Sequence, residues 1–122
     1  MPSFTAPELS YLADRPRLAR LATVGADGTP HVVPVGWSLN RELGAIEVRG
    51  RDFERSKKFR DVQRHPRAAV VIDDLASTDP WRPRGIEVRG RAEAVTAPRP
   101  LIRIFPERIY SWGIDSNGAR GR

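Results

Sequence analysis

The segment Arg55-Ser56-Lys57-Lys58 carries the residue types that point most directly to chemistry. Lys57 and Lys58 are the only two lysines among 21 basic residues, and they form the only adjacent basic pair. Both fall in the first turns of a predicted helix, where the helix macrodipole is positive and added cations cost stability unless an anion lies among them. Free N–H groups, a serine hydroxyl and two ammonium groups favour a phosphate site. The alternative is a solvated basic turn whose repulsion is screened by salt.

Other single residues have a chemical and a packing interpretation. His31 and Tyr110 are the candidate proton donors, although a strand histidine is more often half buried and a C-terminal aromatic more often packs. Trp112 either stacks against a cofactor or packs against the barrel. Asp73 and Asp74 suggest a metal only weakly, because the chain has two histidines and no cysteine; we expect no metal site. No nucleophile–base arrangement is visible in the sequence.

Alternating and apolar runs predict the strands that position these residues. We expect strands over 18–24, 30–39, 45–49, 67–75 and 85–95, followed by one or two strands broken at Pro106. Turns are predicted at 25–28 and 40–44, and a loop at 76–83. The run 67–75 is apolar throughout and predicts burial on both faces. Pro34 cannot donate to a ladder, so its strand is expected to have an edge or a bulge there.

One helix is clear in the sequence. Phe59 and Val62 share a face of the predicted helix over 52–64, with Asp52 as its expected N-cap and Pro66 ending the run. The sum is a mainly β fold of six to seven strands and one clear helix. Such a meander closes into a barrel or a sandwich, and a barrel removes the sheet edges.

The length of 122 residues predicts a single domain over 1–122. We expect residues 1–15 to be a loose N-terminal segment, with a short helix over Pro7–Ala13 as an option, and residues 115–122 to be a polar, disordered tail. No apolar run approaches the ~20 residues that span a bilayer. The start of the chain lacks a signal-peptide pattern, and cysteine is absent, so the expected location is cytoplasmic and away from membranes.

The net charge of +6 predicts an anionic partner, or else reflects codon bias in an arginine-rich chain. Aromatic residues make up 7% of the chain and do not interleave with its densest charge. A single-strand binder needs that interleaving. We therefore expect a phosphorylated small molecule, rather than nucleic acid, as the partner.

Three blocks together resemble the pyridoxamine 5'-phosphate oxidase-like superfamily over roughly residues 17–95. The run from Ser56, Lys57 and Lys58 through Val62 to Pro66 resembles its signature Ser-Arg-Lys-x-x-x-Leu-x-x-Asn-Pro. Residues 18–35 look like the family's first hairpin. Residues 84–93 resemble its strand Arg-Gln-x-x-x-x-Gly-x-Ala-Glu. Each block alone is weak, and their order and spacing make the resemblance specific.

The resemblance implies an FMN-binding split β-barrel in which the basic pair grips a cofactor phosphate and the second strand runs along the flavin ring. Gly85 stands where the oxidase has a glutamine that contacts the ring. The C-terminal segments that hold pyridoxal phosphate are not apparent, which disfavours vitamin B6 oxidation. The cofactor-binding residues expected on this basis are Val32, Pro34, Val35, Ser56, Lys57, Lys58, Gly85 and Trp112, with Arg49, Arg51 and Arg55 for an anionic tail.

Residues 77–85 and 111–113 look closer to the actinobacterial F420-dependent branch. That likeness implies an F420-dependent oxidoreductase that transfers hydride between the deazaflavin and an unidentified small organic substrate. The alternatives are an FMN-dependent enzyme of the same fold and a non-catalytic flavin-, F420- or heme-binding protein. The family also implies a homodimer with the cofactor at the subunit interface, because a barrel of this size is too small to cover such a ligand alone.

Overall fold

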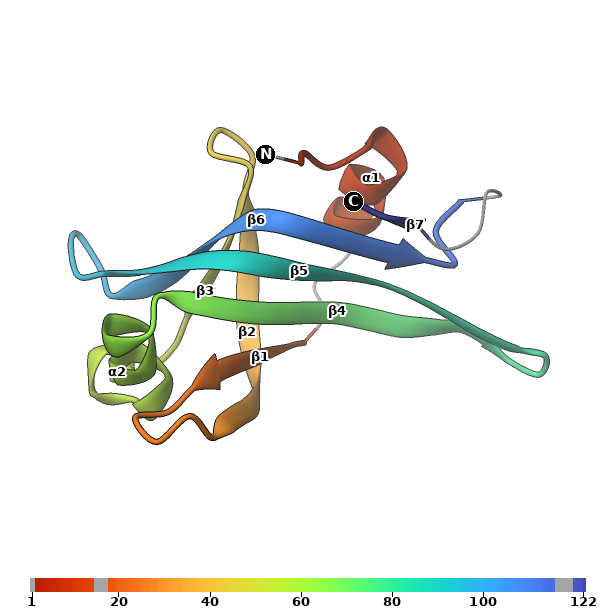
Figure 1. Cartoon of the computed structure of the whole chain (residues 1–122). Coiled ribbons are helices and arrows are strands. Elements are labelled where there is room, and N and C mark those ends of the chain that lie inside the picture. Colours follow the sequence, from red (N-terminus) through yellow and green to blue (C-terminus); the bar gives the residue numbers. More distant parts are fainter. Residues whose placement is uncertain (1, 15–17, 116–119) are drawn as a thin grey trace.

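A computed structural model describes residues 2–14, 18–115 and 120–122 of the chain. In this part of the chain, six antiparallel strands form a closed barrel (Figure 1). The strands are β1 (Ala19–Val24), β2 (Pro30–Asn40), β3 (Ala45–Arg49), β4 (Arg67–Thr78), β5 (Trp81–Val95) and β6 (Leu101–Trp112). The sheet order is β3-β2-β1-β4-β5-β6, and pairing of β3 with β6 closes the ring. The prediction of a mainly β barrel with six to seven strands is confirmed.

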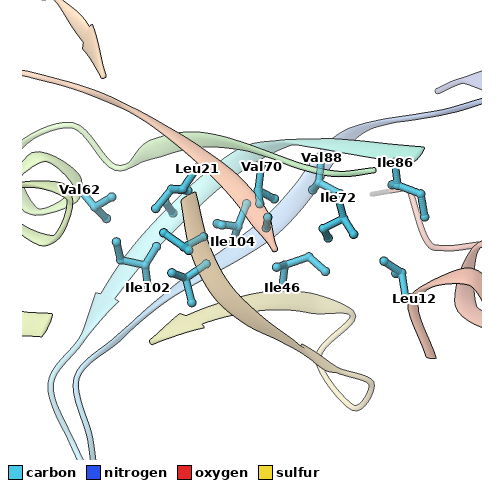
Figure 2. Packing of buried hydrophobic residues seen from close by; sticks show 14 of the residues in the cluster. Leu12, Leu21, Ile46, Val62, Val70, Ile72, Ile86, Val88, Ile102 and Ile104 are labelled. Atoms are coloured by element: carbon cyan, nitrogen blue, oxygen red, sulfur yellow. The ribbon is translucent and has the colours of Figure 1, made fainter. Parts of the chain in front are cut away.

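The barrel interior holds a single apolar core, built by the inward face of every strand (Figure 2). Val62 of helix α2 (Lys57–Arg64) closes the core at one end and Leu12 of helix α1 (Ala6–Asp14) closes it at the other. Burying a large aliphatic side chain contributes about 1.5–3 kcal/mol. The fully buried set includes Leu21, Ile46, Val70, Ile72, Ile86, Val88, Ile102, Ile104 and Ile109.

Helix α1 corrects the expectation of a loose N-terminal segment for residues 6–14. The short helix considered over Pro7–Ala13 is present, and Tyr11 and Leu12 are buried in the core. Thr5 and Glu8 form a capping box, in which the Thr5 N–H donates to Glu8 Oε1 at 2.9 Å and the Glu8 N–H donates to Thr5 Oγ1 at 3.3 Å. This reciprocal pair supplies the start signal that the helix needs.

The C-terminal residues 120–122 correct the predicted polar tail. Strand β7 (Arg120–Gly121) pairs with β6, and the backbone of Arg122 exchanges two hydrogen bonds with Ile109. The Arg122 guanidinium reaches Glu8 of α1, whose carboxylate is 1% exposed. Burial raises the pKa of Glu8, but hydrogen bonds from Arg122 and the Thr5 N–H outweigh it and hold the pKa below its usual value. The remainder of the predicted tail, apart from residue 115, lies outside the described residues.

Helix α2 begins later than predicted. Asp52 has φ 48° and makes no side-chain cap; it precedes a 3₁₀ turn, η1 (Phe53–Arg55). Ser56 is the actual N-cap, because its hydroxyl accepts the Phe59 N–H. The predicted apolar face is confirmed, with Phe59 and Val62 both 1% exposed. The rings of Phe53 and Phe59 meet edge to face at 5.8 Å, which ties the 3₁₀ turn to the helix.

Strands β4, β5 and β6 are longer than predicted. Residues 76–83, expected as a loop, instead extend β4 and β5 into a hairpin that turns between Thr78 and Trp81 (Figure 1). Strand β4 is not buried on both faces: Val70 and Ile72 point inward, whereas Asp73 is exposed, because an antiparallel strand turns alternate residues outward.

Pro106 does not break β6. A register shift between Arg89 and Gly90 absorbs it, and a Cβ at Gly90 would meet the Phe105 carbonyl oxygen at 1.9 Å. Glycine therefore permits the close approach of the two strands. The predicted edge at Pro34 is confirmed, since β2 pairs with β1 at Pro34 but with β3 only from Gly36 onward. No helix in the described ranges is long and apolar enough to cross a membrane.

Candidate cofactor site

A pocket of about 150 Å³ opens between the start of α2 and strand β2. Here it is called the α2 pocket. Three elements supply its walls, so residues far apart in sequence meet in one place. Strand β1 gives one residue, β2 gives three and α2 gives three: Thr23, His31, Val32, Val33, Lys57, Lys58 and Asp61. The predicted pair Lys57 and Lys58 is therefore next to the predicted ring strand.

The N-terminus of α2 directs positive groups into this pocket. Ser56 uses its hydroxyl internally, accepting the Phe59 N–H at 3.3 Å and donating to the Phe53 carbonyl. The Ser56 side chain therefore caps the helix. The backbone N–H groups of Lys57 and Lys58 have no intrahelical acceptor, as in the first turn of any α-helix. They add to the charge of the two side chains.

Asp61 forms the buried floor of the α2 pocket. Its carboxylate accepts Lys57 Nζ at 3.0 Å and Thr23 Oγ1 at 2.9 Å, and the residue is 1% exposed. Burial raises the pKa of Asp61, but the hydrogen bonds from Lys57 and Thr23 outweigh it and hold the pKa below its ordinary value. The ammonium of Lys57 is thus fixed by an internal counter-ion. Lys58 lies over the Phe53 ring at 5.1 Å and has no carboxylate partner among the described residues.

The outward face of the first hairpin is apolar and exposed. Side chains alternate along β2, so Val32 and Pro34 point away from the core while Val35 points into it. Val32 is 68% exposed, whereas Val35 is 6% exposed, so the Val35 side chain supports the strand from within. The pairings Ala22–Val32, Val24–Pro30 and Ala22–Ala69 continue this surface across β1 to β4. We call it the outer strip, and its members are Ala22, Val24, Pro30, Val32, Pro34 and Ala69.

The outer strip contains a second hollow of about 270 Å³ near its β4 and β5 side. Its floor is apolar, and Arg67 and Arg89 stand at its rim. Both arginines are ion-paired on the surface, with Glu107 and Glu87 respectively. This hollow shares Thr23 with the α2 pocket. A charged cavity and an apolar surface are therefore contiguous around the end of β1.

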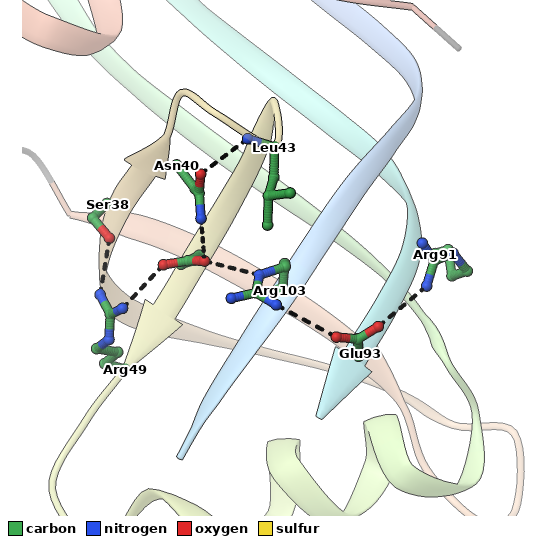
Figure 3. A network of polar contacts seen from close by, with 8 residues as sticks. Ser38, Asn40, Leu43, Arg49, Arg91, Glu93 and Arg103 are labelled. Carbon is green, nitrogen blue, oxygen red and sulfur yellow. Dashed lines mark hydrogen bonds and ion pairs between the residues drawn. The ribbon is translucent and has the colours of Figure 1, made fainter. Parts of the chain in front are cut away.

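Of the three arginines expected to bind an anionic tail, Arg49 is already engaged. It donates to Ser38 Oγ at 3.1 Å and to Glu47 at 3.0 Å (Figure 3). Glu47 is 5% exposed and also accepts from Asn40 and Arg103. Burial raises the pKa of Glu47, and those hydrogen bonds lower it below its usual value. Arg51 and Arg55 are exposed next to η1 and remain the freer cations of the three.

The structure does not bring Gly85, Trp112 or Tyr110 to the α2 pocket. Gly85 is buried, and a Cβ there would meet the Trp112 ring at 2.7 Å, so Trp112 packs over it. Across the sheet, Arg89 of β5 pairs with Ala69, Ala69 pairs with Ala22, and Ala22 pairs with Val32. Gly85 lies four residues from Arg89 along β5, which places it roughly 13 Å along the strand from this row of residues. Tyr110 accepts a hydrogen bond from Arg108 on the outer face of β6.

Asp73 and Asp74 are paired with arginines. Asp73 accepts from Arg20 at 3.0 Å, and Asp74 accepts from Arg84 and from the Tyr11 hydroxyl. Across the described part of the chain, no three His, Asp or Glu side chains group together as metal ligands would. Ion pairs with arginines of the neighbouring strands β1 and β5 account for these two carboxylates of β4 structurally.

Asp61, Thr23 and Val33 are the pocket residues that the sequence reasoning missed. The spacing Lys57-x-x-x-Asp61 on a predicted helix is an i,i+4 ion-pair signal and was enough to place Asp61 beside Lys57. Thr23 gave no such signal, because its contact with Asp61 spans 38 residues and depends on how the barrel closes over the helix.

Comparison with known families agrees with this geometry. The family model described as pyridoxamine 5'-phosphate oxidase matches residues 5–121. The chain belongs to this family. The resemblance inferred from the three sequence blocks is therefore confirmed, and the match extends beyond them to both ends of the barrel.

One curated relative is 42% identical over 127 residues, covering 97% of this chain and 89% of the relative. It is the 5a,11a-dehydrotetracycline/5a,11a-dehydrooxytetracycline reductase of Streptomyces rimosus subsp. rimosus. A conserved hypothetical protein of Mycobacterium tuberculosis shares the fold with a TM-score of 0.74 at 22% identity, covering 90% of this chain and 85% of that one. An F420 reductase shares it with a TM-score of 0.63 at 22% identity, covering 82% and 94%.

Proposed function

We propose that this chain is an oxidoreductase that reduces an unsaturated ring of a small organic substrate with hydride from F420. The proposal rests on one observation: the α2 pocket adjoins the outer strip. One end offers two ammonium groups and free helix N–H groups, and the other offers an exposed apolar surface. That combination suits a ligand with an anionic phosphate and a planar ring.

The residues present fit this group. Lys57 and Lys58 would hold the phosphate, while Val32 and Pro34 would lie against the ring. When bound, F420 supplies the hydride, and the chain binds it, orients it and excludes water. No nucleophile is needed for such a reaction. The similarity to a reductase of dehydrotetracyclines supports a polycyclic, unsaturated substrate.

Two alternatives to an F420-dependent enzyme are an FMN-dependent enzyme and a non-catalytic carrier. FMN also carries a phosphate and a planar ring, so the α2 pocket and the outer strip suit it too. Arg51 and Arg55 favour F420, because a polyglutamate tail needs cations beyond the phosphate site and these two side chains are exposed. A non-catalytic flavin, F420 or heme carrier would bind its ligand but turn over no substrate.

We propose that the outer strip is covered by a second copy of the chain, with the cofactor between the two subunits. Val32 of the outer strip, at 68%, is among the most exposed large apolar side chains of the described residues. Exposed apolar surface of this kind marks an interaction site, and a two-fold dimer would cover both copies at once.

The first test is a titration of the purified protein with F420 and, separately, with FMN, followed by tryptophan fluorescence. We expect micromolar or tighter binding of F420. The double substitution Lys57→Ala/Lys58→Ala should weaken it at least about tenfold, since removing a charged partner of a hydrogen bond costs roughly 1.5–3 kcal/mol.

The matched control is Arg41→Ala/Arg99→Ala, which removes the same charge from two exposed loop positions and should leave affinity unchanged. Equal weakening by both double variants would mean that only overall charge matters. Binding of FMN alone would move the protein to the flavin branch, and binding of neither cofactor would refute the proposed function.

A further inference from the structure

His31 lies on the face of β2 opposite Val32 and Pro34. Its register partner is Thr23, whose side chain points toward α2 and donates to Asp61. The imidazole therefore faces the α2 pocket, while the exposed outer strip lies on the other side of the strand. His31 therefore lies beside the surface proposed for the phosphate, and Val32, which also lines the α2 pocket, joins that surface to the outer strip.

The His31 ring and the Lys57 ammonium converge on one spot of backbone. A Cβ at Gly25 would meet His31 Nε2 at 3.1 Å and Lys57 Nζ at 3.2 Å. Two side-chain nitrogens from different elements thus approach the same glycine. Any side chain at this position would push against both groups, so Gly25 keeps the space between them open.

The charges around His31 otherwise balance. Lys57 and Lys58 approach from α2, Asp61 approaches from the same helix, and Asp27 approaches from the β1–β2 turn. Strand β1 adds only the neutral hydroxyl of Thr23. Two cations and two carboxylates leave the surroundings near neutral, so an imidazolium at His31 decides whether the pocket is net positive.

We propose that His31 is a ligand of the cofactor phosphate and binds it in the protonated form, so that cofactor binding takes up a proton. This rests on the proposed function, and it assigns to His31 a binding role in place of that of a proton donor to substrate. A bound anion beside Lys57 and His31 favours the charged imidazole, and by linkage the charged imidazole favours the bound anion.

The sign of the pH dependence follows. Affinity should rise as the pH falls through the range in which histidine gains its proton. For any binding group that gains a proton with the ligand, a change of one pKa unit on binding corresponds to about a tenfold change in affinity. We therefore expect roughly five- to tenfold tighter F420 binding at pH 6 than at pH 8, over and above any change that the ligand itself contributes.

The test compares wild type, His31→Asn and His65→Asn by F420 titration at pH 6 and pH 8. The chain has two histidines, and His65 is the exposed C-cap of α2, which makes it the matched control. The ratio of affinities should match in wild type and His65→Asn and should fall by about five- to tenfold in His31→Asn. Any pH effect that comes from protonation of F420 itself is the same for all three proteins and cancels in this comparison.

A second measurement follows the imidazole directly. His65→Asn retains a single histidine signal in the NMR spectrum, and its titration midpoint should move to higher pH when F420 is added. Equal loss of affinity at both pH values in His31→Asn, or an unmoved midpoint with F420 bound, would overturn the proposal and leave the proposed function intact. Failure of wild type to bind either F420 or FMN would overturn both.

Discussion

At the scale of single residues, Asp61 combines deep burial with a full charge. It is 1% exposed and accepts hydrogen bonds from Lys57 and Thr23. Breaking a buried pair leaves an uncompensated group, which is more costly than never having built the pair. The carboxylate therefore ties α2 to β1 and at the same time fixes the ammonium group at the mouth of the pocket.

We predict that Asp61→Asn lowers the free energy of unfolding at pH 7 by about 1–2 kcal/mol. The folded-state pKa of Asp61 is lowered from 3.8, so the unfolded state binds more protons and stability rises with pH. The contribution is complete above the unfolded value and is lost as the pH falls through the folded one. Urea denaturation between pH 3 and pH 7 checks this prediction.

The expected result is that the curves of wild type and Asp61→Asn converge as the pH falls below 3.8. The exposed residue Asp79 offers a control, because Asp79→Asn removes the same charge at the tip of the β4–β5 hairpin. A gap between wild type and Asp61→Asn that stays constant through the acid range would show that the lost stability does not come from the charge.

The residues of the site were predictable to different extents. The lysine pair was visible because two lysines stand out among arginines and sit at a helix start. The role of Ser56 as the helix cap was not recognised, because Asp52 is an equally good capping residue by type and only the left-handed backbone at Asp52 decides between them. The alternating pattern of β3 indicates that Glu47 and Arg49 share a face of the strand, but not that they pair with each other.

At the scale of elements, α1 is held to the barrel by a bond between the two ends of the chain. Arg122 donates to both oxygens of the buried Glu8, at 3.0 Å for one of them, and its backbone pairs with Ile109. The Arg122 side chain is 30% exposed while that of Glu8 is 2% exposed. Removing Arg122 leaves the buried Glu8 carboxylate without its charged partner, and the hydrogen bond from the Thr5 N–H remains.

We predict that Arg122→Ala lowers the free energy of unfolding by about 2 kcal/mol, measured by urea denaturation at pH 7. Arg82→Ala, at an exposed position near the start of β5, should change it by less than about 0.5 kcal/mol. In a double-mutant cycle, Glu8→Gln should reduce the effect of Arg122→Ala. An unchanged effect in the Glu8→Gln background would show that the backbone pairing of β7, rather than the ion pair, stabilises this end.

Element boundaries explain most differences between the predicted and observed fold. Alternation located the central part of each strand, since it follows directly from which face is buried. The loop expected at 76–83 was wrong because Pro80, Pro83 and Asp79 favour turns by type, whereas the hairpin ladder continues through Thr78 and Trp81. The Thr5–Glu8 spacing is a capping-box signal for the start of α1, and it favours the short helix over Pro7–Ala13 rather than a loose segment.

At the scale of the whole molecule, the sequence predicts that the strands close into a barrel, but it does not predict which two strands pair to close it. The pairing of β3 with β6 joins Ile46 to Ile104 and Val48 to Ile102. Nothing local in either segment specifies that partner, because both are apolar strands that satisfy the same pattern. The choice is made by the lengths of the intervening hairpins and by the core they fill together.

We predict that Val32→Asp converts the proposed dimer to a monomer, because it places a charge in the centre of the outer strip. Light scattering of the purified protein measures the mass directly. Val32 is 68% exposed, so the substitution should leave the melting temperature of the barrel itself nearly unchanged.

Leu43→Asp is the matched control, since Leu43 is 47% exposed in the β2–β3 turn and away from the strip. It should leave the mass unchanged. A Val32→Asp protein that keeps the mass of wild type would place the contact between subunits elsewhere, and a wild-type monomer that still binds cofactor at full affinity would remove the need for a second copy.

The contact between Arg122 and the backbone of Ser3, made in addition to its contact with Glu8, has a topological consequence. The two ends of the described chain lie side by side (Figure 1), so a short flexible linker would join them without crossing the barrel. New ends opened between Thr78 and Trp81, at the tip of the β4–β5 hairpin, would interrupt no paired strand. The described chain is therefore suited to circular permutation, with helix α2 at the opposite end of the barrel from the cut (Figure 1).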